Sequence, residues 1–375
     1  MLDPGFTTDE MAAVFSTSSR VDALLRFEAE LAHALADVGL APQDTADAVA
    51  AACLTPVPDP EAIVAATWTD GSPLIPLIEE IRSRLSKQDA EWVHHGATTQ
   101  DAIDTATMLQ AREALDILET GLTTVARLAA SLVEEFRGQP QIGRTFLQHA
   151  RPTTFGLRAA CWLDPTVRHI SALRRARGEL VVQLGGPVGN LAPYHGQGLV
   201  MMGALATRLG LETPTLPWHT DRSRVWELVS TVERAARTMA KIAVDIALLA
   251  QSEVAEVRVR AGGSSSMGEK RNPIDAIRAV AAAEVCSGAA AMVTAGRPHE
   301  LDRAIGGWHV EWLAIPLLFQ TAAAAVEGVS TSLGSLEVDA DRMRSQVGQL
   351  GVEPNHDQDL INRVLSEFEL VVGTI

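Results

Sequence analysis

Aromatic residues and cysteines are scarce in this sequence. Aromatic side chains make up 4% of the 375 residues, with a single tyrosine, so a large core must be mainly aliphatic. The three cysteines, Cys53, Cys161 and Cys286, are odd in number and widely spaced, and none has a CxxC partner. This pattern argues against a disulfide framework or a zinc site, and we expect reduced, mostly buried thiols.

Positive charge is also in short supply. There are 31 Lys and Arg residues against 47 Asp and Glu, a formal net charge of −16. Such a surface repels phosphate backbones, so we expect no nucleic-acid partner. A small anionic ligand remains open, because net charge does not describe one local pocket.

Long uninterrupted apolar runs are missing. The most apolar stretch, residues 277–295, is built from alanine and interrupted by Arg278 and Glu284, which predicts a soluble protein without a membrane span. The opening MLDPGFTTDE has neither the basic nor the apolar part of an export signal. We therefore expect a cytoplasmic location.

Heptad patterns dominate the middle of the chain. Apolar residues recur at steps of three and four from Met108 to Phe136 and from Val225 to Leu249. Further helices are expected over 154–183 and 273–295, where neighbouring helices could approach closely at Gly288. No segment alternates strictly between hairpin turns, so the predicted fold class is all-α, a long helical bundle.

Three domains are expected. Residues 1–97 form an N-terminal helical domain with helices near 20–37, 42–52 and 73–85. Residues 98–335 form the central bundle, and residues 336–375 a short C-terminal unit with helices at 339–347 and 357–368. Alanine-rich helices of about 40 Å often complete their burial against other subunits, which favours a homo-oligomer, although an intramolecular bundle is the alternative.

The first polar segment of interest is 260–273. It contains three glycines, three serines and the cations Lys270 and Arg271. Asn272 and Pro273 fit the N-cap and first position of a helix. The composition suits a flexible loop that closes over an anion, or an ordinary connector.

Two more segments are rich in hydrogen-bonding groups. In 94–101, Thr98 and Asp101 have capping-box spacing, so the helix start could hold a carboxylate, or the residues could only cap the helix. The preceding His94 and His95 could be ligands, acids or plain surface groups. Segment 143–156, between two helices, is either a site loop or a polar turn.

Together these segments resemble the fumarase/aspartase superfamily. The matches are GSSSMGEKRNP (263–273), HGATTQD (95–101) and GRTFLQHARPTTFG (143–156), within a resemblance that covers about residues 10–335. Within the superfamily, GWHVEW (307–312) and FEAELA (27–32) are similar to the 3-carboxy-cis,cis-muconate cycloisomerases. The resemblance implies a homotetramer in which three subunits contribute to each active site.

The resemblance also implies the chemistry. A small polycarboxylate, 3-carboxy-cis,cis-muconate, would be converted to a carboxymuconolactone in protocatechuate breakdown, without metal or cofactor. Proton transfer is assigned to Ser264, with Ser265 as competitor and His149 as a further candidate. The residues implied in substrate binding are His95, Thr98, Thr99, Arg144, Gln148, Lys270 and Asn272.

Departures from the superfamily pattern refine this expectation. Phe146 and Ile277 stand where most of these lyases carry a histidine acid and the glutamate that orients it, which favours a cycloisomerase. Gly268 replaces a proline and should loosen the loop. Relatives usually continue beyond the position of Ile375 into a larger helical domain. The alternatives are a β-eliminating lyase acting on a succinate derivative or adenylosuccinate, and a non-catalytic helical scaffold.

Overall fold

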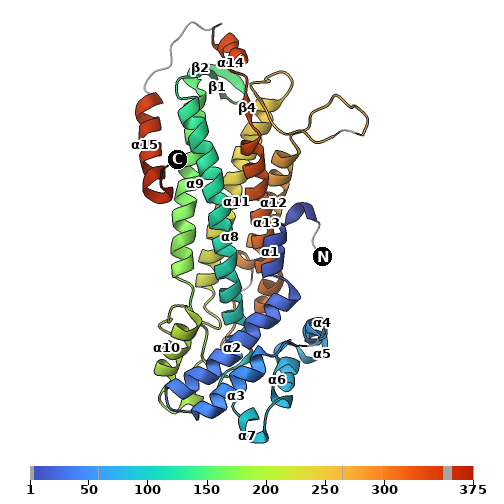
Figure 1. The fold of residues 1–375 in the computed structure, drawn as a ribbon, viewed down its shortest axis with the longest axis vertical. Helices are drawn as coiled ribbons and strands as arrows, with labels where there is room; N and C mark the ends of the chain where they lie inside the picture. The colour runs from blue at the N-terminus through green and yellow to red at the C-terminus, as the bar shows by residue number, and fades with distance from the viewer. Residues whose placement is uncertain (1–3, 58, 264, 297, 349–356, 375) are drawn as a thin grey trace.

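The computed structural model describes residues 4–57, 59–263, 265–296, 298–348 and 357–374 (Figure 1). Helices make up most of this chain, which confirms the all-α prediction. Two small antiparallel sheets of two strands each accompany them.

Long helices form an elongated bundle in the described chain (Figure 1). They are α8 (Thr99–Glu135), α9 (Phe155–Gly178), α11 (Ser223–Ala250), α12 (Ile274–Thr294) and α13 (Gly307–Gly334). The two heptad patterns are confirmed, because the residues at their three-and-four spacing are buried from Met108 to Leu132 and from Val225 to Leu249. The helix over 307–334 was not predicted, since its apolar residues are not confined to one face.

A close helix approach lies at Gly328, and none is found at Gly288, where one was expected. A Cβ at Gly328 of α13 would lie 2.6 Å from the carbonyl oxygen of Asp275 and 3.0 Å from the Cβ of Ala279, both on α12. At Gly288, an added Cβ would meet nothing within 4 Å. Glycine is therefore required where α13 crosses the start of α12.

The remaining N-terminal helices, with η2 (Ala192–Tyr194) and α10 (Gly198–Leu209), lie at one end of the bundle, except that η1 (Pro4–Phe6) and α1 (Asp9–Val14) lie along its side (Figure 1). The N-terminal helices at that end are α2 (Thr17–Asp37), α3 (Gln43–Leu54), α4 (Pro60–Ala65), α5 (Thr67–Asp70), α6 (Leu74–Ser83) and α7 (Lys87–Ala90). The three helices predicted for the N-terminal part correspond to α2, α3 and α6.

The C-terminal helices are α14 (Ala340–Val347) and α15 (Asp357–Val372), close to their predicted ranges. Helix α15 packs along α9, where Arg174 donates a hydrogen bond to the Val371 carbonyl at 2.7 Å. Strands β3 (Val257–Arg258) and β4 (Glu337–Val338) pair at the opposite end of the bundle from α2 and α3 (Figure 1). The three-domain division stays a prediction.

A β-hairpin replaces the polar loop expected between α8 and α9. Strands β1 (Pro140–Thr145) and β2 (Gln148–Thr154) pair antiparallel, with an irregularity at Gly143. Phe146 and Leu147 form the two-residue turn with φ of 52° and 62°, as a type I′ turn requires. The expectation of no hairpin was wrong because this turn lacks the Gly, Asn or Asp that normally signals it.

The core is continuous and mainly aliphatic, as expected. Cys53 and Cys286 are buried and Cys161 is exposed, and none of them forms a disulfide. By length and composition α12 and α13 could cross a membrane, a test that core helices of soluble proteins also pass. Of their most apolar windows, 44% and 67% are buried within the chain.

Candidate active site

The start of α8 is fixed by a buried carboxylate. Thr98 caps the helix in the predicted capping box with Asp101, and Asp101 accepts a hydrogen bond from the Thr98 backbone N–H at 3.0 Å. Asp101 also accepts from the backbone N–H groups of Gly185 and Gly186 at 3.0 and 2.9 Å, and lies 2.7 Å from His219 Nε2. These partners hold the hydroxyls of Thr98 and Thr99 in a preorganised position.

The glycine-rich segment beside Asp101 was missed from the sequence. Gly186 has a φ of 72°, and a Cβ there would lie 2.9 Å from the Gly96 carbonyl oxygen. A Cβ at Gly185 would lie 2.7 Å from the His219 ring. The run GGPVGN at 185–190 was the available signal, because such a run allows close backbone approach.

Arg303 brings a positive charge to the same place and was also missed. Its guanidinium donates to Gln100 Oε1 at 2.9 Å and to the Pro187 carbonyl at 3.1 Å, and it reaches Thr98 Oγ1 at 3.5 Å. Arg303 forms no salt bridge with any of the described residues. Its charge is therefore available to an anion at the start of α8.

A buried ionic network supports this end of the bundle. Arg222 bonds the Asp104 carboxylate with both Nη atoms, at 2.7 and 3.0 Å, and also pairs with Glu311. Burial opposes the charge on Arg222, but the two carboxylates outweigh it and raise its pKa. Trp308 Nε1 donates to Asp104 at 2.9 Å, which ties α13 to α8.

The two adjacent histidines have different surroundings. His94 Nδ1 lies 2.7 Å from the buried Glu28 carboxylate. Burial alone would lower the pKa of His94, but Glu28 outweighs it and raises that pKa. The His95 ring lies on the Trp92 ring at 4.7 Å and is partly buried near Thr98, so His95 rather than His94 stays available to a ligand.

The hairpin carries the second group of predicted residues. Gln148 and His149 are exposed at the start of β2. Arg144 on β1 is committed to the buried Glu256, with contacts of 2.6 and 3.1 Å, and also donates to Gln346 at 2.6 Å. Because Glu256 neutralises Arg144, its predicted role as a substrate cation has no support from this geometry. Phe146 at the tip is 99% exposed.

The Gly/Ser loop carries the third group. Ser264 lies outside the described residues. Ser265 and Lys270 are exposed, and Lys270 makes no salt bridge within the described part of the chain. The N-cap of α12 is Pro273, not Asn272 as predicted. Asn272 instead closes the base of the loop, where its carbonyl accepts from Gly262 N–H at 2.9 Å and its amide donates to Gly263 at 3.4 Å.

One chain does not bring the three groups together. The hairpin and the Gly/Ser loop lie at one end of the bundle, and the Thr98 group lies at the other (Figure 1). Helix α8, with 37 residues, separates them by about 55 Å. Among the described residues, no cluster of three His, Cys, Asp or Glu side chains could hold a metal ion.

Comparisons with known proteins identify the family. A sequence model described as lyase matches residues 5–324. The chain is 40% identical over 356 residues to a 3-carboxy-cis,cis-muconate cycloisomerase of Pseudomonas aeruginosa, covering 93% of this chain and 78% of that protein. It is 34% identical to a nitrosuccinate lyase of Streptomyces davaonensis, covering 94% of this chain and 77% of that protein.

A solved structure agrees with the sequence matches. The crystal structure of 3-carboxy-cis,cis-muconate lactonizing enzyme from Pseudomonas putida superposes with a TM-score of 0.86 at 33% identity. The match covers 99% of this chain and 89% of the Pseudomonas putida chain. With the helix start, hairpin and Gly/Ser loop in place, the chain belongs to the lyase family of enzymes, the fumarase/aspartase superfamily.

Proposed function

We propose that the protein is a cycloisomerase that interconverts 3-carboxy-cis,cis-muconate and a carboxymuconolactone. The observation that carries this proposal is the apolar pair Phe146 and Ile277 at the positions where most superfamily members hold a histidine and a glutamate. Neither side chain can transfer a proton, so a lyase mechanism through that pair cannot operate. The likeness to cycloisomerases points to the same reaction.

In the lactone-forming direction, one substrate carboxylate adds across a conjugated C=C bond and the adjacent carbon takes up a proton. The nucleophile is tethered within the substrate, so positioning supplies much of the rate. Groups that stabilise the developing aci-carboxylate supply the rest. We assign proton transfer to Ser264, with Ser265 and His149 as the other candidates.

Substrate carboxylates are held, in this proposal, by residues from both ends of the bundle: His95, Thr98, Thr99, Gln148, Lys270 and Asn272. Arg303 joins them because its guanidinium already reaches Thr98 and has no carboxylate partner among the described residues. Arg144 is less suited, because Glu256 pairs with it. The exposed Lys270 and Arg271 keep the site locally positive in a chain of net charge −16.

The active site is completed, we propose, by other copies of the chain in a homotetramer. The segments of the site lie at opposite ends of one bundle. A second copy whose bundle runs antiparallel to the first must therefore supply the segments from the other end. Apolar side chains left exposed on the bundle and hairpin favour such packing: Phe146 99%, Ile277 49% and Val244 41%.

The test is turnover of purified protein with 3-carboxy-cis,cis-muconate, followed by loss of the diene's ultraviolet absorbance. We expect loss of absorbance with this substrate and none of the fumarate formation that a β-eliminating lyase would show with succinate derivatives. Nitrosuccinate and adenylosuccinate are the competitor substrates. Fumarate formation without lactone formation would reassign the protein to a β-eliminating lyase, and inactivity on every substrate would favour a scaffold.

A further inference from the structure

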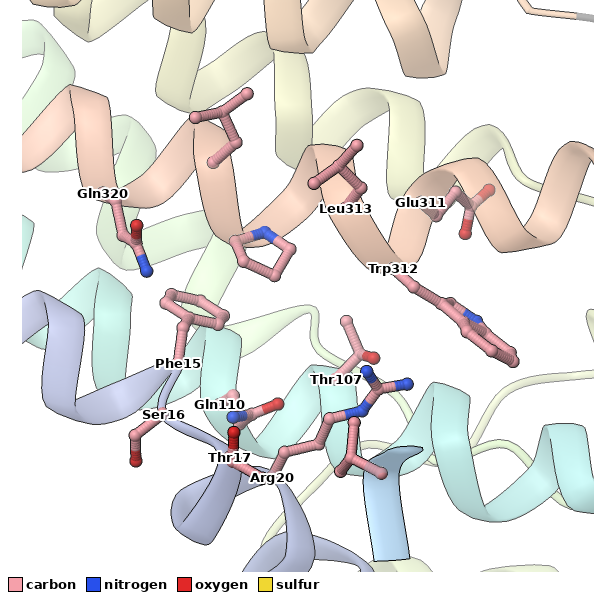
Figure 2. A pocket seen from close by; sticks show the side chains of 13 residues that line it. Phe15, Ser16, Thr17, Arg20, Thr107, Gln110, Glu311, Trp312, Leu313 and Gln320 are labelled. Carbon is pink, nitrogen blue, oxygen red and sulfur yellow. The ribbon is translucent and has the colours of Figure 1, made fainter. Parts of the chain in front are cut away.

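A cavity of about 420 Å³ lies between the start of α2, the first third of α8 and the first half of α13 (Figure 2). It is separate from the Thr98 group, since Thr107 on its wall lies about 13 Å along α8 from Thr98. Phe15, Trp312 and Pro316 give it flat apolar walls. Its size suits a ligand of about one ring.

Arg20 is a cation without an anion in this cavity. Its side chain extends from α2 into the space between α8 and α13, with the guanidinium over the Trp312 ring at 5.2 Å (Figure 2). Within the described ranges, this guanidinium forms no ion pair or hydrogen bond. Burial lowers the pKa of Arg20, so the charge is held at a cost in desolvation.

The position of Arg20 along its helix adds to that cost. Ser16 caps α2, and Arg20 follows at the end of the first turn, where the helix dipole disfavours a cation. The first turn contains no acidic residue that could compensate. A bound anion would relieve both the desolvation of Arg20 and its unfavourable place at the positive end of α2.

The other polar groups of the wall do not compete for this role. Trp312 Nε1 has no hydrogen-bond partner among the described residues, but it is buried and not exposed to the cavity. The carboxylate on this wall, Glu311, is bound by Arg222, so it does not serve Arg20. Thr17 and Gln320 add a hydroxyl and an amide to the lining. The cavity thus offers one unpaired cation and a flat apolar surface.

We propose that this cavity binds a small aromatic carboxylate, with its carboxylate at Arg20 and its ring against the apolar wall. A single unpaired cation suits one carboxylate, whereas the substrate of the proposed reaction carries three. This site therefore goes beyond the proposed function and is an accessory site for an aromatic acid. The Glu311–Arg222–Asp104 network connects its wall to the helix that carries Thr98.

The test is isothermal titration calorimetry of the full chain at low ionic strength, with benzoate as probe and benzyl alcohol as its uncharged counterpart. We expect benzoate to bind at least about tenfold more tightly than benzyl alcohol, because the carboxylate makes charge-assisted hydrogen bonds. Arg20→Gln should weaken benzoate binding by about tenfold or more and leave benzyl alcohol unchanged. Arg26→Gln, an exposed arginine on the same helix, is the matched control and should change neither.

Several outcomes would overturn the site. They are no benzoate binding tighter than about 10 mM, equal effects of Arg20→Gln and Arg26→Gln, or loss of benzoate binding in Lys270→Ala, which would assign the probe to the proposed active site. If circular dichroism shows that Arg20→Gln is misfolded, Arg20→Met keeps the packing of the aliphatic stem and removes the charge. Unchanged benzoate binding in that variant would equally exclude the site. Turnover is measured separately, so the two proposals can fail independently.

Discussion

Ser264 is the residue on which the proposed chemistry depends most directly. Ser264→Ala should lower kcat by about 10²- to 10⁴-fold, because it removes the proton-transferring hydroxyl. Helicity and assembly should stay intact, as checked by circular dichroism and light scattering. Ser265→Ala is the matched control and should have a much smaller effect. The reverse order of effects would transfer the role to Ser265.

His169 should make stability depend on pH. It lies on α9 and faces α11, with Nε2 2.8 Å from Thr238 Oγ1. Burial, with the neighbouring Arg168 and Arg234, lowers the pKa of His169 from its usual 6.5 to about 4. Between pH 6.5 and pH 4, His169 is protonated in the unfolded chain but not in the folded protein. The free energy of unfolding is therefore highest above pH 6.5 and falls as the pH drops toward 4.

From pH 7 to pH 5 we expect this histidine to cost about 2 kcal/mol in the free energy of unfolding. His169→Gln keeps a donor and an acceptor for Thr238. Between pH 7 and pH 5, its free energy of unfolding should fall by about 2 kcal/mol less than that of the wild type. Urea unfolding at the two pH values measures the difference. Equal losses in the two proteins would show that His169 is not the responsible group.

Among the elements, the crossing of α12 and α13 depends on the absence of a side chain at Gly328. Gly328→Ala should destabilise the fold by about 1–3 kcal/mol, because its Cβ would meet the Asp275 carbonyl oxygen at 2.6 Å. Gly203→Ala in α10 is the control: nothing lies within 4 Å of its Cβ, so helix propensity should leave stability unchanged or slightly higher. Chemical denaturation compares the two. A tolerated Gly328→Ala would mean that the two helices can separate without loss.

The sequence was most informative where one helix face is buried. The repeats in α8 and α11 predicted both helices because each has a polar face and an apolar face. Helix α13 gives no such contrast, since alanines such as Ala322 and Ala325 are buried on several of its sides. The hairpin was missed because Phe146 and Leu147 adopt positive φ without the usual residue types.

The candidate site was predictable only in part, for a similar reason. Thr98 and Asp101 were found because a capping box is local in sequence. Arg303 and Gly185 were missed because they reach the start of α8 through tertiary packing, from segments more than eighty residues away. The same distance hid the Glu256 carboxylate that occupies Arg144.

At the scale of the whole molecule, the proposed tetramer predicts that activity is shared between chains. Light scattering should give a mass of about 160 kDa, four times 40.0 kDa. Ser264→Ala and Thr99→Ala each remove one segment's contribution, so each protein alone should be nearly inactive. Mixed tetramers, formed by co-expression, should regain about a quarter of wild-type activity. In an equal mixture each active site receives an intact Ser264 segment half of the time and an intact Thr99 segment half of the time.

Two Ser264 variants, such as Ser264→Ala and Ser264→Gly, serve as the control mixture and should regain nothing. If Ser264→Ala and Thr99→Ala also fail to complement each other, the two segments act within one chain. A monomeric mass with full turnover would also contradict the shared site. In a single bundle the Thr98 segment and the Ser264 segment are separated by the length of α8, so a monomer could not bring them together.

Helix α8 holds Thr98 at one end and leads into the β1–β2 hairpin at the other (Figure 1). In the proposed assembly, the two ends of α8 belong to different active sites, so this one helix connects them directly. We expect neighbouring centres to sense each other's occupancy without any ligand moving between them.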